Sequence, residues 1–228
     1  MVKRRKFVIG LGALVAGSGA ALGTGASVNS TMDRDSDINV VNDDEGLLAL
    51  SPGTEADSDV VRLTSNPGEL TIDFSGRNDG GVNVNSKYQV GSLTGGNNDI
   101  AVFDKVGGGP TTHNAFTVVN NDTVHRDVTL EYSAANPGDL NQNGSYLYFE
   151  ARPLDTLSPS GRAPIKDMRV DSNNPTASFS YSADNLNDDS IDSGNGIGVS
   201  ILVDTTGSNA DSGEDLTGTL TISGGTAP

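Results

Sequence analysis

The clearest pattern in the chain is an alternation of apolar and polar residues between positions 115 and 132. The apolar side chains share one side of a period of two, and the polar ones share the other. They are Val124, Val128, Leu130 and Tyr132 against His125, Asp127, Thr129 and Glu131. A shorter apolar run, Phe116 and Val118, comes first, and the polar residues 120–122 between the two runs are typical of a turn. The pattern predicts a β-hairpin with one face in a core and the other in water.

Similar short runs recur from residue 60 to residue 223, separated by clusters of Gly, Asn, Asp and Pro. The clearest alternate over 70–74, 177–181, 197–203 and 216–222. We find no stretch with a helical period. About nine or ten strands of this kind predict an all-β fold, an antiparallel β-sandwich of the jelly-roll type over residues 60–228.

The first 26 residues have the pattern of an export signal. A basic stretch at residues 3–6 precedes Phe7 and a mildly apolar segment rich in Gly and Ala. The pair Arg4 and Arg5 just before Phe7 resembles a twin-arginine signal, which exports folded proteins. We expect cleavage after Ala26, an extracellular or cell-surface product, and no membrane-spanning segment in the mature chain. A retained N-terminal anchor is the alternative.

The net charge and the cysteine content exclude several kinds of partner and of chemistry. The chain has 14 basic and 30 acidic residues, and residues 3–6 hold four of the basic ones, so the mature chain has 10 against 30, a net charge of −20. Asp accounts for 24 of the 30 acids. We interpret this as adaptation to high salt; an ordinary acidic secreted protein is the alternative. Such a charge repels nucleic acid and anionic lipid. The absence of Cys excludes disulfides and thiolate chemistry.

One loop has the spacing of a calcium site. Between Asp139 and Glu150, oxygen-bearing side chains stand at the first, third and fifth positions, Gly is sixth, and Glu is twelfth. The candidate ligands of Ca²⁺ are Asp139, Asn141, Asn143 and Glu150. The residues after position 145 form a strand pattern and not a helix, so an EF-hand is not expected. An ordinary turn explains the same residues.

Three sites match the acceptor pattern for N-linked glycans: Asn29, Asn121 and Asn143. Chance matches are common in a chain rich in Asn, Ser and Thr. The two histidines have no metalloprotease spacing, and neither a nucleophile elbow nor a phosphate loop is present. We therefore do not expect an enzyme, and no cofactor is predicted besides Ca²⁺.

Residues 27–59 form an acidic leader with two short apolar islands, at 38–41 and 47–50. They have two interpretations. The islands pair within their own sheet as its first strand, or they leave the domain and add to a neighbour's sheet. The candidate donor residues are Ile38, Val40, Leu47, Leu48 and Leu50. Head-to-tail insertion does not close, so it would generate an open filament.

Several of these segments carry a resemblance to known families. They are the Arg-Arg signal, Val40–Asp44 with Leu47–Leu50, Phe116–Asn121 with the strand after it, and residues 197–204 and 216–222. The layout resembles secreted haloarchaeal β-sandwich proteins of uncharacterised function and, more distantly, the TasA/camelysin family of matrix-fibre proteins. This resemblance implies a jelly-roll subunit that polymerises by lending an N-terminal strand. The metalloprotease activity described for some camelysin-like members has no matching site residues here.

Together these features predict an extracellular structural or adhesive protein of a halophilic archaeon, a fibre or matrix subunit that associates with itself or with cell-envelope components. A monomeric calcium- or envelope-binding β module is the alternative, and a hydrolase ranks third.

Export tests the signal assignment. Changing Arg4 and Arg5 together to Lys should leave the precursor inside the cell, because the twin-arginine receptor distinguishes Arg from Lys. Fractionation of cells and medium, followed by immunoblotting, measures the result. Normal secretion of the double variant would contradict a twin-arginine signal.

Overall fold

The computed structural model describes residues 45–54, 56, 60–65, 68–74, 81–94, 112–154, 165–182 and 190–226. These described residues belong to one compact unit. The signal residues Arg4, Arg5 and Phe7 lie outside the described residues, as do Asn29, Ile38 and Val40.

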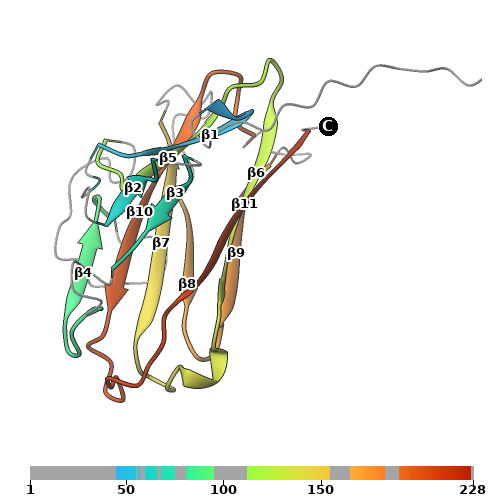
Figure 1. Cartoon of the computed structure of the whole chain (residues 1–228). Coiled ribbons are helices and arrows are strands. Elements are labelled where there is room, and N and C mark those ends of the chain that lie inside the picture. Colours follow the sequence, from blue (N-terminus) through green and yellow to red (C-terminus); the bar gives the residue numbers. More distant parts are fainter. Residues whose placement is uncertain are drawn as a thin grey trace, which may run out of the picture. The chain divides into compact units, whose positions relative to one another are not determined.

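The described residues form eleven β-strands and one short 3-10 helix, Pro137–Asp139. A six-stranded sheet has the order β1 (Leu48–Pro52), β5 (Phe116–Asn120), β10 (Gly196–Asp204), β7 (Tyr146–Pro153) and β8 (Lys166–Val170), with β4 (Lys87–Val90) also beside β10. A three-stranded sheet has the order β11 (Gly218–Thr226), β6 (Arg126–Ala134) and β9 (Thr176–Tyr181). A small pair joins β2 (Val61–Leu63) and β3 (Leu70–Ile72). Every pairing is antiparallel, so the all-β antiparallel prediction is confirmed (Figure 1).

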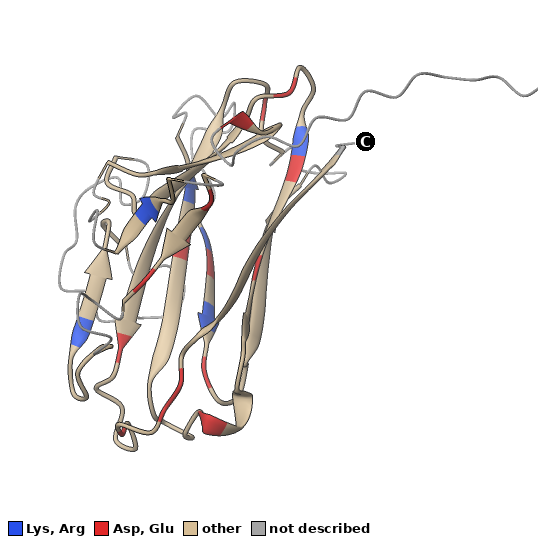
Figure 2. Cartoon of the chain, viewed as in Figure 1, with Lys and Arg blue, Asp and Glu red and all other residues tan. Residues whose placement is uncertain are grey.

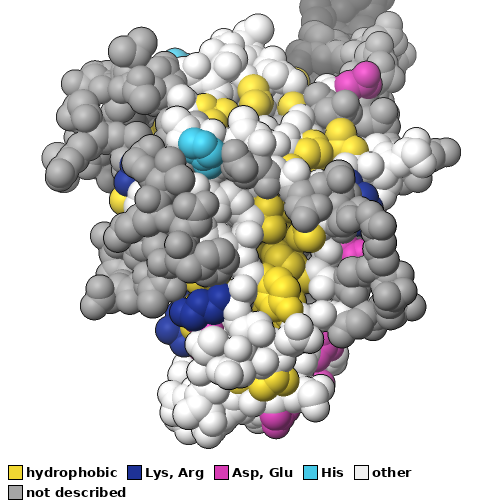
Figure 3. Space-filling view, turned by 90° about the vertical axis from the view of Figure 1, so that its left-hand side faces the viewer, with side chains coloured by type: hydrophobic (Ala, Val, Ile, Leu, Met, Phe, Trp, Pro, Cys, Tyr) yellow, Lys and Arg dark blue, Asp and Glu magenta, His cyan; other side chains and the backbone are white. Residues whose placement is uncertain are grey.

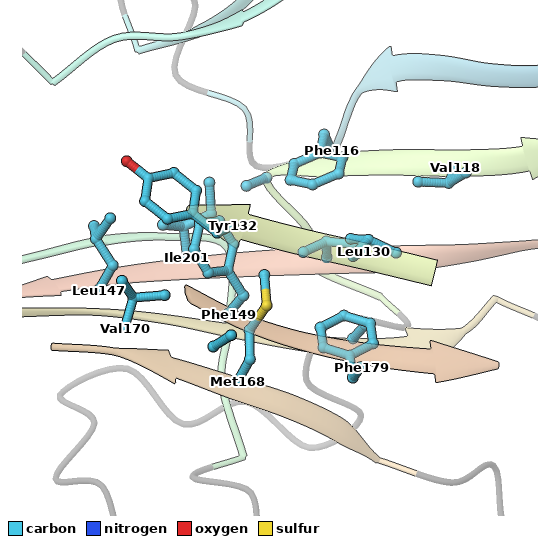
Figure 4. Close-up of a cluster of buried hydrophobic side chains, with 14 of the residues drawn as sticks. Phe116, Val118, Leu130, Tyr132, Leu147, Phe149, Met168, Val170, Phe179 and Ile201 are labelled. Atoms are coloured by element: carbon cyan, nitrogen blue, oxygen red, sulfur yellow. The ribbon is translucent and has the colours of Figure 1, made fainter. Parts of the chain in front are cut away.

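The core lies between the six-stranded and three-stranded sheets, because each sheet turns one apolar face toward the other. The two sheets contribute side chains that lie together in Figure 4, among them Phe116, Phe149 and Ile201 from the first and Leu130 and Phe179 from the second. Two contacts tie the layers together. The rings of Tyr132 and Phe149 lie 5.5 Å apart, and the Tyr181 hydroxyl donates a hydrogen bond to the Ala151 carbonyl oxygen at 2.8 Å.

The predicted hairpin is wrong, although both of its strands exist. β5 pairs with β1 and β10, whereas β6 pairs with β11 and β9, so the connection between them crosses from one sheet to the other. Phe116 and Val118 therefore face Leu130 across the core instead of lying beside it in one sheet (Figure 4). A strand has one apolar face in either arrangement, so the alternation does not distinguish a hairpin from a crossing.

Asn120 holds this crossing together. Its side chain is fully buried, and its amide nitrogen donates to the carbonyl oxygens of Val124 and Ile191, both at 2.8 Å. Its side-chain oxygen accepts from the Asp122 backbone N–H at 3.0 Å. One side chain thus satisfies two backbone groups of the connection and ties it to Ile191, whose carbonyl oxygen also accepts from the Arg126 N–H at 3.0 Å. His125 follows the crossing as an exposed residue, with its Nδ1 3.0 Å from the Asp192 carboxylate.

Replacing Asn120 with Ala should lower the free energy of unfolding by about 1–3 kcal/mol, because the Val124 carbonyl oxygen and the Asp122 N–H lose their partner and the Ile191 carbonyl oxygen loses one of its two donors. Denaturant unfolding monitored by circular dichroism measures the loss. The neighbouring change Asn121→Ala is the matched control, since Asn121 is exposed; it should cost below ~1 kcal/mol. Equal losses in the two variants would contradict this role for Asn120.

Candidate functional site: the first strand and the loop pole

The first strand, β1, lies at the edge of the six-stranded sheet and pairs with β5 from Leu48 opposite Asn120 to Pro52 opposite Phe116. Leu48 and Leu50 are partly buried and pack on the core. Leu48 also comes close to β11: a Cβ added to Gly224 would lie 2.6 Å from the Leu48 Cδ1 atom. Side chains from the leader therefore form part of the sandwich.

Of the five candidate donor residues, the structure thus places Leu48 and Leu50 in their own sheet. Leu47 precedes the strand with 64% of its surface exposed. Hydrogen bonds anchor both ends of β1. The Asn121 N–H donates to the Leu47 carbonyl oxygen at 2.9 Å, and the Gly53 N–H donates to the Ala115 carbonyl oxygen at 2.8 Å.

Two of the three glycan acceptor sites lie on exposed turns. Asn121 is exposed, and its side-chain amide donates to the Gly46 carbonyl oxygen at 3.1 Å, so it lies against the entry to β1. Asn143 is exposed with a φ of 57°, in the left-handed region that Asn tolerates better than most residues. Both sites are open to solvent, and modification stays a prediction.

The candidate calcium loop meets the connection between β10 and β11 at one end of the sandwich. We call residues 136–145 and 205–217 the loop pole. The Glu214 carboxylate binds across it: the Asn141 N–H donates to it at 2.9 Å, the Ser145 N–H at 3.0 Å and the Ser145 hydroxyl at 2.6 Å. The Asn141 side-chain amide donates in turn to the Asp211 carboxylate at 3.1 Å. The loop is thus closed by a carboxylate from a distant part of the chain.

Glu150 lies elsewhere, buried in β7. Its carboxylate accepts from the Thr94 hydroxyl at 2.6 Å and from the Thr94 N–H at 3.0 Å. The structure therefore brings Asp139, Asn141 and Asn143 into one loop but gives the Glu150 carboxylate different partners. Within the described residues, no group of three or more His, Cys, Asp or Glu side chains is arranged to hold a metal ion.

A buried charge cluster joins three strands on the outer face of the six-stranded sheet. The Asp204 carboxylate lies 2.7 Å from the Lys87 ammonium and accepts from the Tyr146 hydroxyl at 2.7 Å. Burial raises the pKa of Asp204, but hydrogen bonds from Lys87, Thr206 and Tyr146 outweigh it and lower the pKa below its usual value. Burial and the hydrogen bond to Asp204 raise the pKa of Tyr146. These groups satisfy one another, so the cluster holds β4, β7 and β10 together.

The surface on the β4 side shows a strip of hydrophobic side chains between polar ones, next to residues outside the described set (Figure 3).

No protein-family model matches the chain, and no curated protein is similar to it at a significant level. In the described part of the chain, no helix is long and apolar enough to cross a membrane. The functional argument for β1 and the loop pole therefore rests on their geometry.

Sequence analysis missed Glu214, the carboxylate that closes the loop. Its separation from Asn141 and Ser145 is 73 and 69 residues, so no local spacing relates them. Glu150 matched the spacing of a calcium loop, but the strand that follows residue 145 carries it away. An extended strand rises ~3.3 Å per residue, against 1.5 Å in the helix of an EF-hand.

Replacing Glu214 with Ala should lower the free energy of unfolding by about 1–2 kcal/mol, because two backbone N–H groups lose their acceptor. Asp139→Ala is the matched control, since Asp139 is exposed and belongs to the same loop; without calcium it should change stability by less than ~0.5 kcal/mol. Calorimetry with and without Ca²⁺ separates the two roles. Calcium binding would raise the melting temperature of the wild type but not of Asp139→Ala. Equal destabilisation by the two substitutions would contradict the role of Glu214.

Proposed function

We propose that this chain is an extracellular structural subunit of a halophile that associates with further copies through its first strand. The observation that supports this most is the position of β1. It is the first described strand in the chain and lies at one edge of its sheet, where β5 is its only partner among the described strands.

Such a strand is suited to exchange between copies. If β1 of one copy replaced β1 of the next, its pairs with β5 would be the same pairs formed between two chains. The order β5-β10-β7-β8 would remain intact without it. An emptied position would expose the hydrogen-bonding edge of β5 and the part of the core that Leu48 and Leu50 cover. A donated strand would therefore find both a backbone partner and a place for its side chains.

The sequence supports an extracellular, high-salt environment for this subunit. The twin-arginine pattern is consistent with export of an already folded domain, and the net charge of −20 calculated for the mature chain is consistent with molar salt. At molar ionic strength the Debye length falls to ~3 Å, so such acidic copies can approach each other. A fibre or matrix component at the cell surface accounts for all of these features together.

A monomeric binding module for calcium or the cell envelope is the second candidate. It is supported by the oxygen-rich side chains of Asp139, Asn141 and Asn143 on one loop. It has less support than the structural role, because Asn141 already takes part in the contacts with Glu214 and Asp211.

A pair of engineered cysteines tests strand exchange directly. Ser51 of β1 lies opposite Thr117 of β5, and hydrogen-bonded antiparallel partners have Cα atoms ~5.5 Å apart, within disulfide range. The native chain has no Cys, so Ser51→Cys with Thr117→Cys permits one disulfide. Under strand exchange, oxidation at high salt should give a ladder of covalent multimers on a non-reducing denaturing gel.

Either single variant serves as the control, because it lacks the partner thiol and should give at most dimers. Oxidation to completion within monomers, with no ladder from a concentrated sample, would contradict the strand-exchange proposal while confirming the register of β1 and β5.

A further inference from the structure

The strand β11 is a second sheet edge, unpaired on one side among the described strands. β11 has nine residues and pairs with β6 along its whole length, from Gly218 opposite Ala134 to Thr226 opposite Arg126. It stands at the end of the three-stranded sheet, and no other described strand is paired to its far side. Most of its residues are exposed. Figure 1 shows it crossing the front of the sandwich beside β6.

The register shows which backbone groups face outward. The Ala135 N–H donates to the Thr217 carbonyl oxygen at 2.8 Å, so odd-numbered residues of this segment form the hydrogen-bonded pairs with β6. The even-numbered residues alternate with them. Gly218, Leu220, Ile222 and Gly224 therefore direct their N–H and C=O groups away from β6, toward the open edge.

This edge has none of the features that usually prevent strands from pairing. Natural edge strands are protected by charged side chains, Pro, bulges or short length. β8 carries Lys166, Asp167 and Arg169, and β1 is short and ends in Pro52. β11 has the sequence GTLTISGGT with an unbroken register, and Figure 2 shows it without a charged residue.

We propose that β11 is the docking edge for β11 of a second copy, paired antiparallel about a two-fold axis at Thr221. The strand is self-complementary in this register. Gly218 would face Gly224 of the second copy, and Leu220 would face Ile222, so each outward-directed backbone group meets another one. The apolar pair Leu220 and Ile222 then extends the core side of the sheet, and Thr219 faces Ser223 on the solvent side. The two three-stranded sheets become one sheet of six.

Charge favours this edge over the acidic parts of the surface. Two copies with a net charge of −20 each repel one another wherever acidic residues meet, and β11 contributes none. The acidic residue nearest the centre is Glu131, opposite Thr221 on β6. The Glu131 residues of the two copies would lie three strand spacings apart, or about 14 Å. That exceeds the Debye length of ~3 Å at molar salt but not the ~30 Å of dilute buffer, so pairing should strengthen as salt increases.

This inference does not depend on the proposed function, because β11 and β1 belong to different sheets. A chain that never exchanges β1 can still pair through β11. If both contacts operate, each copy has an isologous edge and an exchanged strand, which together link copies in two directions.

A single cysteine tests the pairing. In the proposed register Thr221 forms a non-hydrogen-bonded pair with its counterpart, with Cα atoms ~4.5 Å apart, within disulfide range. Thr221→Cys should therefore form a covalent dimer on mild oxidation in molar salt. Its initial rate should exceed that of the control by about tenfold or more, because pairing holds the thiols at a high effective concentration.

Ser178→Cys is the matched control. Ser178 is also exposed and also lies opposite Glu131, but on β9 at the other edge of the same sheet. Mixing Thr219→Cys with Ser223→Cys tests the register, since the mixture should give heterodimers faster than either variant alone gives homodimers. Equal rates for Thr221→Cys and Ser178→Cys would overturn the proposal, as would sedimentation of the wild type as a monomer at every concentration in molar salt. Equal rates for the two cysteine variants would leave exchange of β1 untouched, whereas a wild type that stays monomeric at every concentration would contradict both contacts.

Discussion

The burial of β10 on both faces is the constraint that organises this sandwich. All nine of its residues are buried. Its inward side chains, Ile197, Val199, Ile201 and Val203, meet the three-stranded sheet. Its outward side needs a second cover: Leu202 packs with Leu93 and Tyr148, and the Ser200 hydroxyl donates to the His113 carbonyl oxygen at 3.1 Å. Polar groups buried by this cover require partners of their own, which explains the contacts of Glu150 with Thr94 and of Asp204 with Lys87.

The strands were predictable from sequence because alternation records which face of a strand is buried. That signal was clear for β6, β9 and β11, and it gave the all-β antiparallel class. It does not record which strand is the neighbour, and this is why the pattern predicts a hairpin of β5 and β6 where the structure has a crossing. The connection depends on Asn120, a residue equally typical of an exposed turn. The outward residues of β10 were also missed, since Ser200 and Gly198 resemble a solvent face until the segments that cover them are known.

The candidate sites differ in the same way: local sequence patterns are readable, whereas contacts between distant segments are not. For the apolar island at 47–50 the sequence leaves two alternatives open, pairing in its own sheet or donation to a neighbour, and the structure packs Leu48 and Leu50 on the core of their own sandwich. The island at 38–41 lies outside the described residues. The closure of the loop pole by Glu214 cannot be predicted from the sequence, because it depends on how two loops meet after folding. The two sheet edges differ in character: β1 packs Leu48 and Leu50 on the core, whereas β11 is an uncharged strand whose even-numbered residues direct their backbone groups away from β6. The contact of Leu48 with Gly224 places them next to each other.

We propose that this acidic β-sandwich is exported and that its edges join copies of itself at high salt. Electron microscopy of the protein secreted into molar salt tests this claim most directly. The account predicts filaments or other regular assemblies, which disperse on dialysis to low salt as the acidic copies repel each other. Single particles of monomer size at the same concentration in molar salt would contradict it.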